Sequence, residues 1–422
     1  MPDLQIQVSR EPKTAPVPAG YHDFMIKILD TTPSAGLDIS SSVQRLRAYH
    51  TVERRSIRIL AGWFLYAPAY ETKYKLGYHL WDHAEHVTWL RQRLAEMRGG
   101  QPDASVPPAL RALMDEALQA PDTDSMLRGL YGVIKRALLQ AYKEHLDLAD
   151  AAANASEIRL LRRLIPEVDA QLEWYESLNL EQQSDPWQEY IRALLNAAGG
   201  ITGGQPKGPM PICPAGKRFE RSRTIHFDAR VHSGELTPYE TRRTLDPQAA
   251  TVEQFKVFFN ELYAASLLAS VLFDSFDDGN PWEFYSDFSH HFWDEVRHSE
   301  FGALRLKELG HSPAVCNPAL YEQSESLPVL HRICYLTLGL EVYFMPRKLP
   351  RVREYQANGD ARSQLFADQD WSDETNHVRY GKRWIDHLLQ DDQRSPEDLQ
   401  DEIRAHFERV TGRPQTEISA PY

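Results

Sequence analysis

The sequence predicts an all-α protein made of two four-helix bundles in tandem. Helical periodicity runs through long segments with few breakers, no comparable strand pattern appears, and a Gly/Pro-rich stretch separates two helical halves. At 422 residues the chain is too long for one small core and suits two or three domains of ordinary size. A composition of 42% hydrophobic and 25% charged residues is typical of a soluble globular protein.

The segments with helical periodicity follow one another in the order 43–98, 126–195, 251–310, 328–348 and 362–390. The stretch after residue 195, AAGGITGGQPKGPMPICPAG, is rich in Gly and Pro and predicts a linker. We therefore divide the chain into an arm at 1–40, a helical bundle at 41–195, the linker at 196–250, a second bundle at 251–395, and a tail at 396–422 that opens with a short helix over 396–412.

Charge and cysteine content limit the partners. A formal net charge of -13 argues against a nucleic-acid backbone or an anionic membrane surface. Cys213, Cys316 and Cys334 are odd in number and widely spaced, so they predict neither a disulfide framework nor a Cys-x-x-Cys metal site. The start resembles no secretory leader, and no uninterrupted apolar run approaches the length of a membrane helix. We expect a cytoplasmic protein without nucleic-acid or membrane partners.

Two apolar segments of the second half each contain one ionisable carboxylate. Glu261 lies in VFFNELYAASLLASVLF, and Glu341 is the only charged residue in ICYLTLGLEVYFMP. An ionised carboxylate in such surroundings costs several kcal/mol unless a cation compensates it. Each glutamate is therefore expected to be buried beside a positively charged partner.

A Glu-x-x-His motif follows each of these glutamates: Glu295 and His298 in WDEVRH, and Glu374 and His377 in SDETNH. Side chains at i and i+3 emerge on one face of a helix, so each motif can offer an oxygen and a nitrogen to one metal. The motifs follow their glutamates by 34 and 33 residues, a spacing that returns the chain to the same depth in two antiparallel hairpins. Four ligand-bearing helices can thus converge on one centre.

The whole order of Glu, Glu-x-x-His, Glu, Glu-x-x-His over residues 251–390 resembles the ferritin-like superfamily of di-iron and di-manganese carboxylate proteins. The resemblance implies six metal ligands, with Glu295 and Glu374 as bridging carboxylates and one histidine per metal: Glu261, Glu295, His298, Glu341, Glu374 and His377. It also implies that Asp294 and Asp373, which precede the two motifs, orient ligand histidines.

The charges of this set suit two divalent ions, because four carboxylates and two ions of charge +2 sum to zero. Mixed carboxylate and imidazole ligation favours iron or manganese. We expect two iron ions, with manganese or a mixed pair as the alternative. His290 and His291 are expected to be ordinary helix residues outside the ligand set, although His291 lies seven positions before His298 and so could approach the site.

The first half contains a related segment. WDHAEHVTWLRQRLAEM aligns without a gap with WDEVRHSEFGALRLKEL, but His83 stands where Glu295 would be. This similarity predicts an internal duplication, with the two bundles paired as subunits pair in a homodimer. The remaining ligands are not found in the first half, so we expect a structural or interface role for residues 41–195. A mononuclear metal site at Glu53, His83 and His86 is the alternative.

The resemblance implies a dioxygen-dependent oxidoreductase that acts on a small organic molecule, with no catalytic residue beyond the metal ligands. A ferroxidase or iron-handling protein and a non-catalytic metal-bound scaffold are the alternatives. The partners expected are dioxygen, a small-molecule substrate and an electron donor, with a homodimer left open. The sequence identifies neither the substrate nor the donor.

Overall fold

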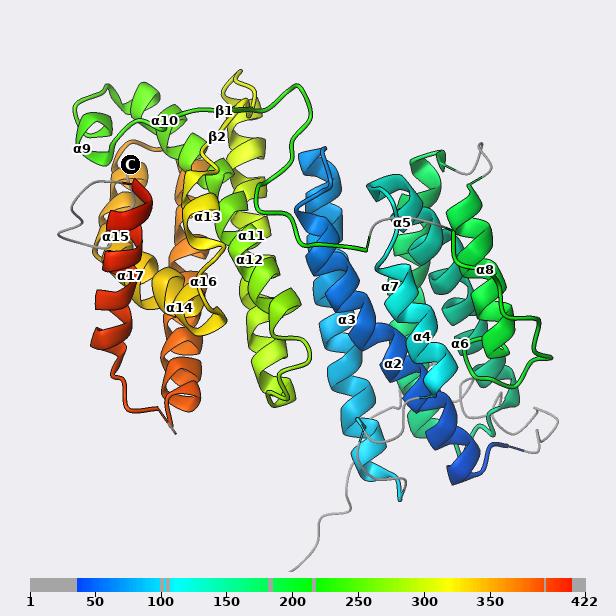
Figure 1. The fold of residues 1–422 in the computed structure, drawn as a ribbon. Helices are drawn as coiled ribbons and strands as arrows, with labels where there is room; N and C mark the ends of the chain where they lie inside the picture. The colour runs from blue at the N-terminus through cyan, green and yellow to red at the C-terminus, as the bar shows by residue number, and fades with distance from the viewer. Residues whose placement is uncertain are drawn as a thin grey trace, which may run out of the picture.

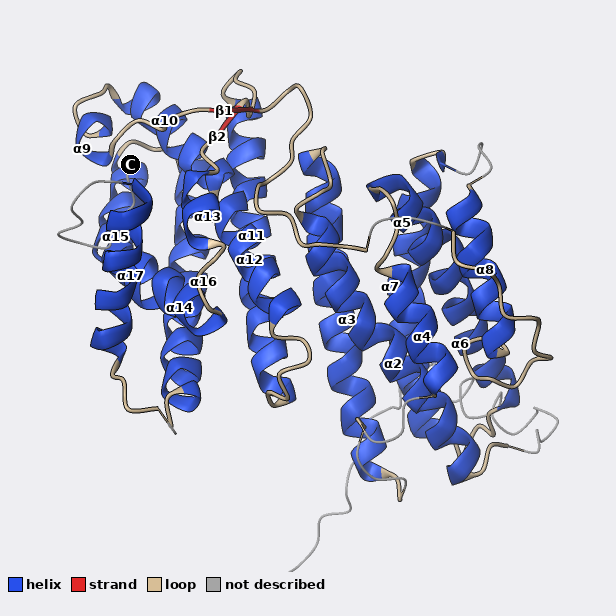
Figure 2. Ribbon diagram, in the orientation of Figure 1, coloured by secondary structure: helices blue, strands red, loops and turns tan. Residues whose placement is uncertain are grey.

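The computed structural model describes residues 36–98, 102–103, 107–180, 185–214, 218–390 and 392–411. Its fold is almost entirely helical, which confirms the all-α prediction (Figures 1 and 2). The only strands in the described part are β1 (His232–Ser233) and β2 (Val315–Cys316), which pair in parallel. Most of the arm predicted at 1–40, and the end of the tail, lie outside the described residues.

The N-terminal half contains seven α-helices and one π-helix in the described part: α2 (Ile39–Phe64), α3 (Tyr70–Glu96), α4 (Pro108–Ala117), α5 (Thr123–Gly129), η1 (Leu130–Lys135), α6 (Arg136–Leu148), α7 (Ala155–Ser177) and α8 (Pro186–Ala198). Local sequence explains several starts. Asp38 caps α2 by accepting a hydrogen bond from the backbone N–H of Ser41, and Asp185 caps α8, where proline takes the first helical position.

The C-terminal half contains the elements that build the candidate site: α9 (Tyr239–Arg242), α10 (Pro247–Asn260), α11 (Leu262–Asp274), α12 (Trp282–Glu308), α13 (Ala319–Ser324), α14 (Val329–Cys334), the π-helix η3 (Tyr335–Glu341), α15 (Val342–Ala357), α16 (Ala361–Leu388) and α17 (Pro396–Thr411). The predicted linker, 196–250, also holds the end of α8, β1, α9 and the start of α10. Its backbone bonds to the N-terminal half, with the N–H of His226 donating to the carbonyl of Leu65 at 3.0 Å.

Both lone glutamates lie where a regular α-helix is interrupted. The predicted helix around Glu261 divides there, since α10 ends at Asn260 and α11 begins at Leu262. Glu341 ends η3, and π-helical turns are rare and frequent at functional sites. The predicted helix over 328–348 is therefore three consecutive segments, and α15 continues it to Ala357.

The segment Pro247–Asp274 is long and apolar enough to span a membrane by length and composition. Glu253, Lys256 and Glu261 interrupt this segment, so it is not an uninterrupted apolar run. Of its most apolar window, 78% is buried inside the protein, as in the core helix of a globular domain. This burial follows from its packing, because α11 contacts both α12 and α2.

The two halves meet through α2 and α3 on one side and α11 and α12 on the other (Figure 1). The rings of Trp81 and Trp293 stack with centroids 5.8 Å apart and an angle of 13° between their planes. These tryptophans occupy matching positions in the two aligned segments. Contact between matching residues is what an interface around a two-fold axis produces near the axis.

Two glycines bring helices close together at the candidate site. A Cβ on Gly302 of α12 would come within 2.7 Å of Phe259 Cα, and a Cβ on Gly381 of α16 within 2.8 Å of Thr337 Cγ2. Each glycine lies four residues after the histidine of a Glu-x-x-His motif, one turn along the same face. These contacts fix how closely the glutamate-bearing segments approach the motif helices.

Adding a methyl group at either glycine should therefore destabilise the C-terminal half. We expect Gly302→Ala and Gly381→Ala each to lower the free energy of unfolding by about 1–3 kcal/mol, the usual cost of overpacking a core. Thermal melting followed by circular dichroism measures the change. Gly204→Ala, where the added Cβ meets only ordinary contacts, is the control. Equal melting temperatures for all three variants would show that the helices can separate without cost.

Candidate metal centre

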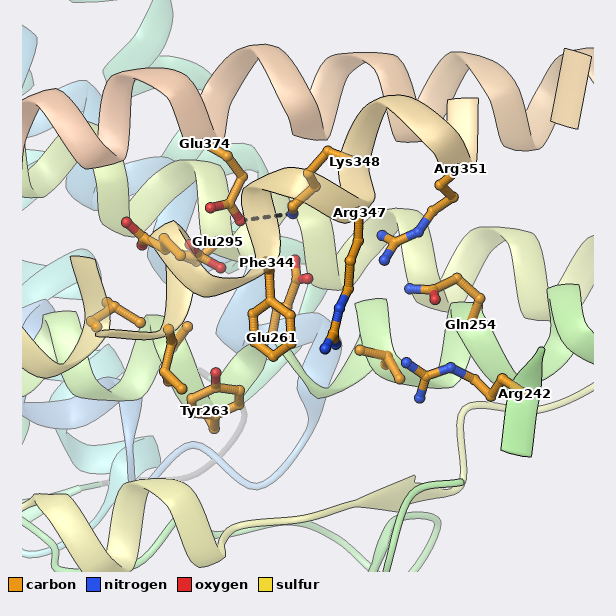
Figure 3. A pocket seen from close by; sticks show the side chains of 15 residues that line it. Arg242, Gln254, Glu261, Tyr263, Glu295, Phe344, Arg347, Lys348, Arg351 and Glu374 are labelled. Atoms are coloured by element: carbon orange, nitrogen blue, oxygen red, sulfur yellow. Dashed lines mark hydrogen bonds and ion pairs between the residues drawn. The ribbon is translucent and has the colours of Figure 1, made fainter. Parts of the chain in front are cut away.

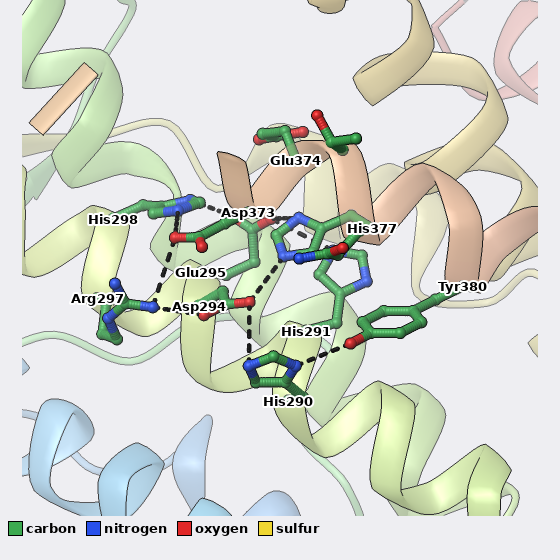
Figure 4. A network of polar contacts seen from close by, with 12 residues as sticks. His290, His291, Asp294, Glu295, Arg297, His298, Asp373, Glu374, His377 and Tyr380 are labelled. Atoms are coloured by element: carbon green, nitrogen blue, oxygen red, sulfur yellow. Dashed lines mark hydrogen bonds and ion pairs between the residues drawn. The ribbon is translucent and has the colours of Figure 1, made fainter. Parts of the chain in front are cut away.

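The six residues predicted as ligands lie together in the C-terminal half. Glu295 and His298 come from α12, Glu374 and His377 from α16, and the two lone glutamates from the helix interruptions (Figures 3 and 4). These residues fall into overlapping groups in which one potential ligand atom of each member lies within 4.8 Å of the others. The sequence prediction and the geometry therefore indicate the same place.

Glu295 lies between the two histidines. Its Oε1 is 3.4 Å from His377 Nδ1, and its Oε2 is 3.8 Å from His298 Nδ1. His298 Nδ1 also lies 3.2 Å from Glu261 Oε2, and His377 Nδ1 lies 3.7 Å from Glu341 Oε1. The arrangement fits two metal positions, each with one histidine and one lone glutamate, that share Glu295.

The aspartates before the two motifs contact the outer nitrogens of the histidines. His298 Nε2 is 3.1 Å from Asp373 Oδ2, and His377 Nε2 is 3.2 Å from Asp294 Oδ2. Each aspartate therefore reaches the histidine of the other motif helix. An Nε2–H that donates to a carboxylate leaves the Nδ1 lone pair directed at the centre, as metal-binding histidines require. Arg297 joins both aspartates, at 2.5 Å from Asp294 and 3.4 Å from Asp373.

The inner atoms of this cluster lack hydrogen-bond partners. They include His298 Nδ1, His377 Nδ1, Glu261 Oε2, Glu374 Oε2 and both carboxylate oxygens of Glu341. Native proteins pair the great majority of their buried polar atoms. Several orphaned oxygen and imidazole atoms around one point are therefore a donor set that fits a metal pair.

The structure adds two residues to the predicted set. His291, expected to be an ordinary helix residue, is fully buried with Nε2 2.7 Å from Glu341 Oε1, and it belongs to a candidate metal group. Asp370 belongs to another such group, 3.8 Å from His298 Nδ1. His291 and Asp370 each lie seven residues before a motif histidine, which is two turns along the same helix face. This seven-residue offset before a motif histidine is the sequence pattern that indicates both residues.

His290, in contrast, lies outside the centre as expected. Its Nδ1 is 2.8 Å from the hydroxyl of Tyr380 (Figure 4). Its ring stacks on Trp81. It packs between the motif helices and the N-terminal half.

A buried lysine accompanies the carboxylates. Lys348 Nζ lies 2.7 Å from Asp370 Oδ1 and 3.0 Å from Glu374 Oε1. Sequence reasoning missed it because a lysine inside a helix normally indicates a solvated face. Its single positive charge offsets the added charge of Asp370, so the balance between four glutamates and two divalent ions is unchanged.

Burial favours the protonated forms of two glutamates in the centre. Burial raises the pKa of Glu261 to about 7, and burial together with the carboxylates of Glu341 and Glu295 raises the pKa of Glu374 to about 8. Burial opposes the charged form of His298, but the hydrogen bond to Asp373 and the nearby carboxylate of Glu261 raise its pKa well above the usual value. Metal ions must displace these protons, because ligands bind in their deprotonated forms.

The N-terminal half has a hydrogen-bonded cluster at the predicted remnant. Glu53 accepts hydrogen bonds from Tyr142 Oη at 2.6 Å and from His86 Nδ1 at 3.1 Å, and it also contacts His83 Nδ1. His86 Nε2 lies 2.6 Å from Glu167 Oε2. Glu53, His83 and His86 lie close enough to hold a metal, but protein donors already occupy both oxygens of Glu53. This arrangement favours a structural role.

The contacts of the cluster around Glu53 correspond to those of the candidate metal centre in the C-terminal half. The pair His86 and Glu167 repeats the pair His298 and Asp373. Since Asp82 matches Asp294, its hydrogen bond from Gln171 at 2.8 Å places Gln171 where the centre has a histidine.

Two further positions of the centre also have a different residue in the N-terminal half. Val168, three residues before Gln171, has the place of a motif glutamate. Lys135 ends the π-helix η1 as Glu341 ends η3, and its Nζ donates to Gln171 Oε1 at 2.7 Å. Burial lowers the pKa of Lys135 to about 7. A valine, an amide and an ammonium group thus stand where the centre has three potential ligands.

The metal content of the chain should reflect the different ligand sets of the two halves. We expect about two metals per chain after reconstitution with iron, because one half alone offers a full ligand set. Glu295→Ala and His377→Ala should each remove at least one metal, whereas the control His83→Ala should keep both. Elemental analysis of desalted protein measures the content. Four metals per chain would show that the N-terminal half also holds a metal pair, and loss of metal in His83→Ala only would move the site to that half.

Metal uptake should also release protons. At pH 7, loading with Mn²⁺ should release about two protons or more per chain, and the affinity should rise between about pH 6 and pH 8 as the ligands lose their protons. Calorimetry in buffers of different ionisation enthalpy counts the released protons. In His377→Gln the count should fall. Uptake without proton release at any pH would show that the ligands are already deprotonated.

Comparison with known proteins gives one match. Residues 225–418 match a family model described as "Protein of unknown function (DUF455)". No curated protein matches the chain, and no solved structure does. The matched segment contains all six predicted ligands, together with His291, Lys348 and Asp370, and begins after the N-terminal half. The similarity to that family therefore covers the C-terminal half of this chain.

Proposed function

We propose that the chain is a ferritin-like di-iron oxidoreductase that uses dioxygen to oxidise or oxygenate a small organic molecule. One observation carries the proposal: Glu261, Glu295, Glu341 and Glu374 line a single pocket, so the carboxylates that would hold the metals also face a space for a ligand (Figure 3). Clefts that join convergent polar groups to an apolar lining are the usual form of small-molecule sites.

In this proposal α10 to α12 and η3 to α16 form a ferritin-like bundle, and the N-terminal half is a duplicated copy that has lost its metal ligands. The stacking of Trp81 on Trp293 and the matching contacts of the two clusters support the duplication. The N-terminal half would then pair with the active half as an inactive subunit, in keeping with the structural role predicted for it.

The residues of the proposed centre would have different roles. His298 and His377 would each hold one iron with Glu295 bridging, while Asp294 and Asp373 fix the rings. Two ferrous ions would supply electrons to reduce dioxygen, a chemistry that belongs to the metal pair. Leu336, Leu340 and Phe344 line the pocket, and apolar side chains there exclude water from the reacting groups. His291 and Asp370 would complete the ligand set.

Two alternatives use the same site differently. A ferroxidase would oxidise iron as its substrate and have no need of an organic ligand, and a scaffold would keep the metals without turnover. The pocket beside the carboxylates favours the oxidoreductase over both. Manganese in place of iron would keep the geometry and change the reactivity.

Oxygen consumption tests the proposal. Anaerobic protein loaded with two ferrous ions per chain should consume dioxygen faster than free ferrous ion, because the ligands leave coordination positions open and hold two reducing ions together. An oxygen electrode with stopped-flow absorbance measures the rate. Glu295→Ala should lose the reaction and the control His83→Ala should keep it.

Three results would contradict the proposal. A loaded protein that is inert to oxygen would be a scaffold, and one isolated with manganese would not be an iron enzyme. Repeated turnover of added ferrous ion, unaffected by any organic compound, would identify a ferroxidase.

A further inference from the structure

The pocket beside the candidate centre has a cationic side. The carboxylates of the centre line one part of it, and three arginines line another: Arg242, Arg347 and Arg351. Figure 3 shows these arginines on the side of Lys348 away from Glu295 and Glu374. From this arrangement we propose that the substrate is an organic anion, a carboxylate or a phosphate monoester, held by Arg347 and Arg351 with its apolar body directed at the metal ligands. This inference rests on the proposed function.

Arg347 is available to bind an anion. It is partly buried, its Nη2 donates to the hydroxyl of Tyr343 at 2.9 Å, and its guanidinium lies 4.2 Å from the ring centre of Tyr239. Within the described part of the chain, no carboxylate lies at ion-pair distance from it. The aromatic contacts orient the guanidinium while leaving most of its N–H donors for a ligand.

Arg351 lies one turn further along α15, on the same face as Arg347. Its side chain is 14% exposed, and its ion pair with Asp370 is long, at 4.0 Å. Asp370 is already bound by Lys348 at 2.7 Å, so the charge of Arg351 is only weakly compensated. Two guanidinium groups spaced in this way suit a planar carboxylate or a phosphate, which arginine binds with paired hydrogen bonds.

Charge balance favours an anion over a neutral ligand. In the loaded site, two divalent ions would neutralise the four glutamates, and Lys348 would neutralise Asp370. The arginines would then leave the outer part of the pocket positive. A neutral ligand would cover these charges without compensating them, which is unfavourable in a partly buried site.

An apolar surface lies in the same pocket. Its side chains include Val257, Ala264, Leu336, Leu340 and Phe344. These apolar side chains adjoin the arginines and the carboxylates in one cleft, which is the usual form of a small-molecule site. The fitting ligand is therefore amphipathic, with one anionic end and an apolar body.

Binding of three six-carbon probes tests this inference. Protein loaded with Mn²⁺, whose metal content is measured first, is titrated with hexanoate, hexyl phosphate and hexanol, and the proton relaxation of each probe is followed by NMR. We expect hexanoate or hexyl phosphate to bind at least about tenfold more tightly than hexanol, as charge-assisted hydrogen bonds imply. The tighter of the two anions identifies the headgroup. Manganese should relax the terminal methyl protons more than the methylene next to the anion.

Two substitutions test the arginines. Arg347→Gln, and separately Arg351→Gln, should weaken binding of the anion at least about tenfold while the metal content and melting temperature stay unchanged. Arg353→Gln is the matched control, because Arg353 is exposed on the same helix and its replacement removes the same charge. It should bind the probes as the parent protein does.

The outcomes separate the two proposals. A chain that takes up no manganese overturns the metal centre itself. A loaded chain that binds hexanol as tightly as the anions, or is unaffected by both arginine substitutions, overturns only the anionic substrate. Strongest relaxation at the methylene next to the anion would place the anion on the metals, which also overturns the arginine assignment.

Discussion

The C-terminal half depends on a constraint that follows from burial of charge. Five carboxylates lie close together in the core of a helical bundle, and Lys348 beside them compensates one. Such a cluster is stable only with protons or cations among its oxygens. The orienting aspartates, the helix interruptions at the two lone glutamates and the close-packed glycines all serve to hold these oxygens at fixed positions.

Much of this centre could be predicted from the sequence because its ligands carry a recognisable spacing. Glu-x-x-His places two ligands on one helix face whatever surrounds it, and a lone glutamate in an apolar segment is conspicuous. His291 and Asp370 were missed since a histidine or aspartate two turns away has many other uses in a helix. No sequence pattern around Lys348 indicates its role, because that role depends on the carboxylates that the fold brings beside it.

The fold, too, could be predicted from the sequence only in part. Long helices followed from periodicity, but the break at Glu261 and the π-helical turns before Glu341 did not. The break at Glu261 has no proline or glycine, and Gly339 by itself does not predict a π-helical turn. In the N-terminal half the alignment at Trp81 found one segment that resembles its counterpart in the C-terminal half. Val168, Gln171 and Lys135 could be matched to positions of the candidate centre only through three-dimensional contacts, because none of them is a residue type in the predicted ligand pattern.

The side chain of Lys135, unlike a bound metal ion, is covalently attached to the chain. A bound ion depends on supply and can dissociate, whereas a lysine is present from the moment of synthesis. If the C-terminal half binds a metal pair as proposed, the N-terminal half would fold without waiting for that metal, and α3 would then offer α12 a formed surface. In that proposal the N-terminal half would be an internal template for the C-terminal half.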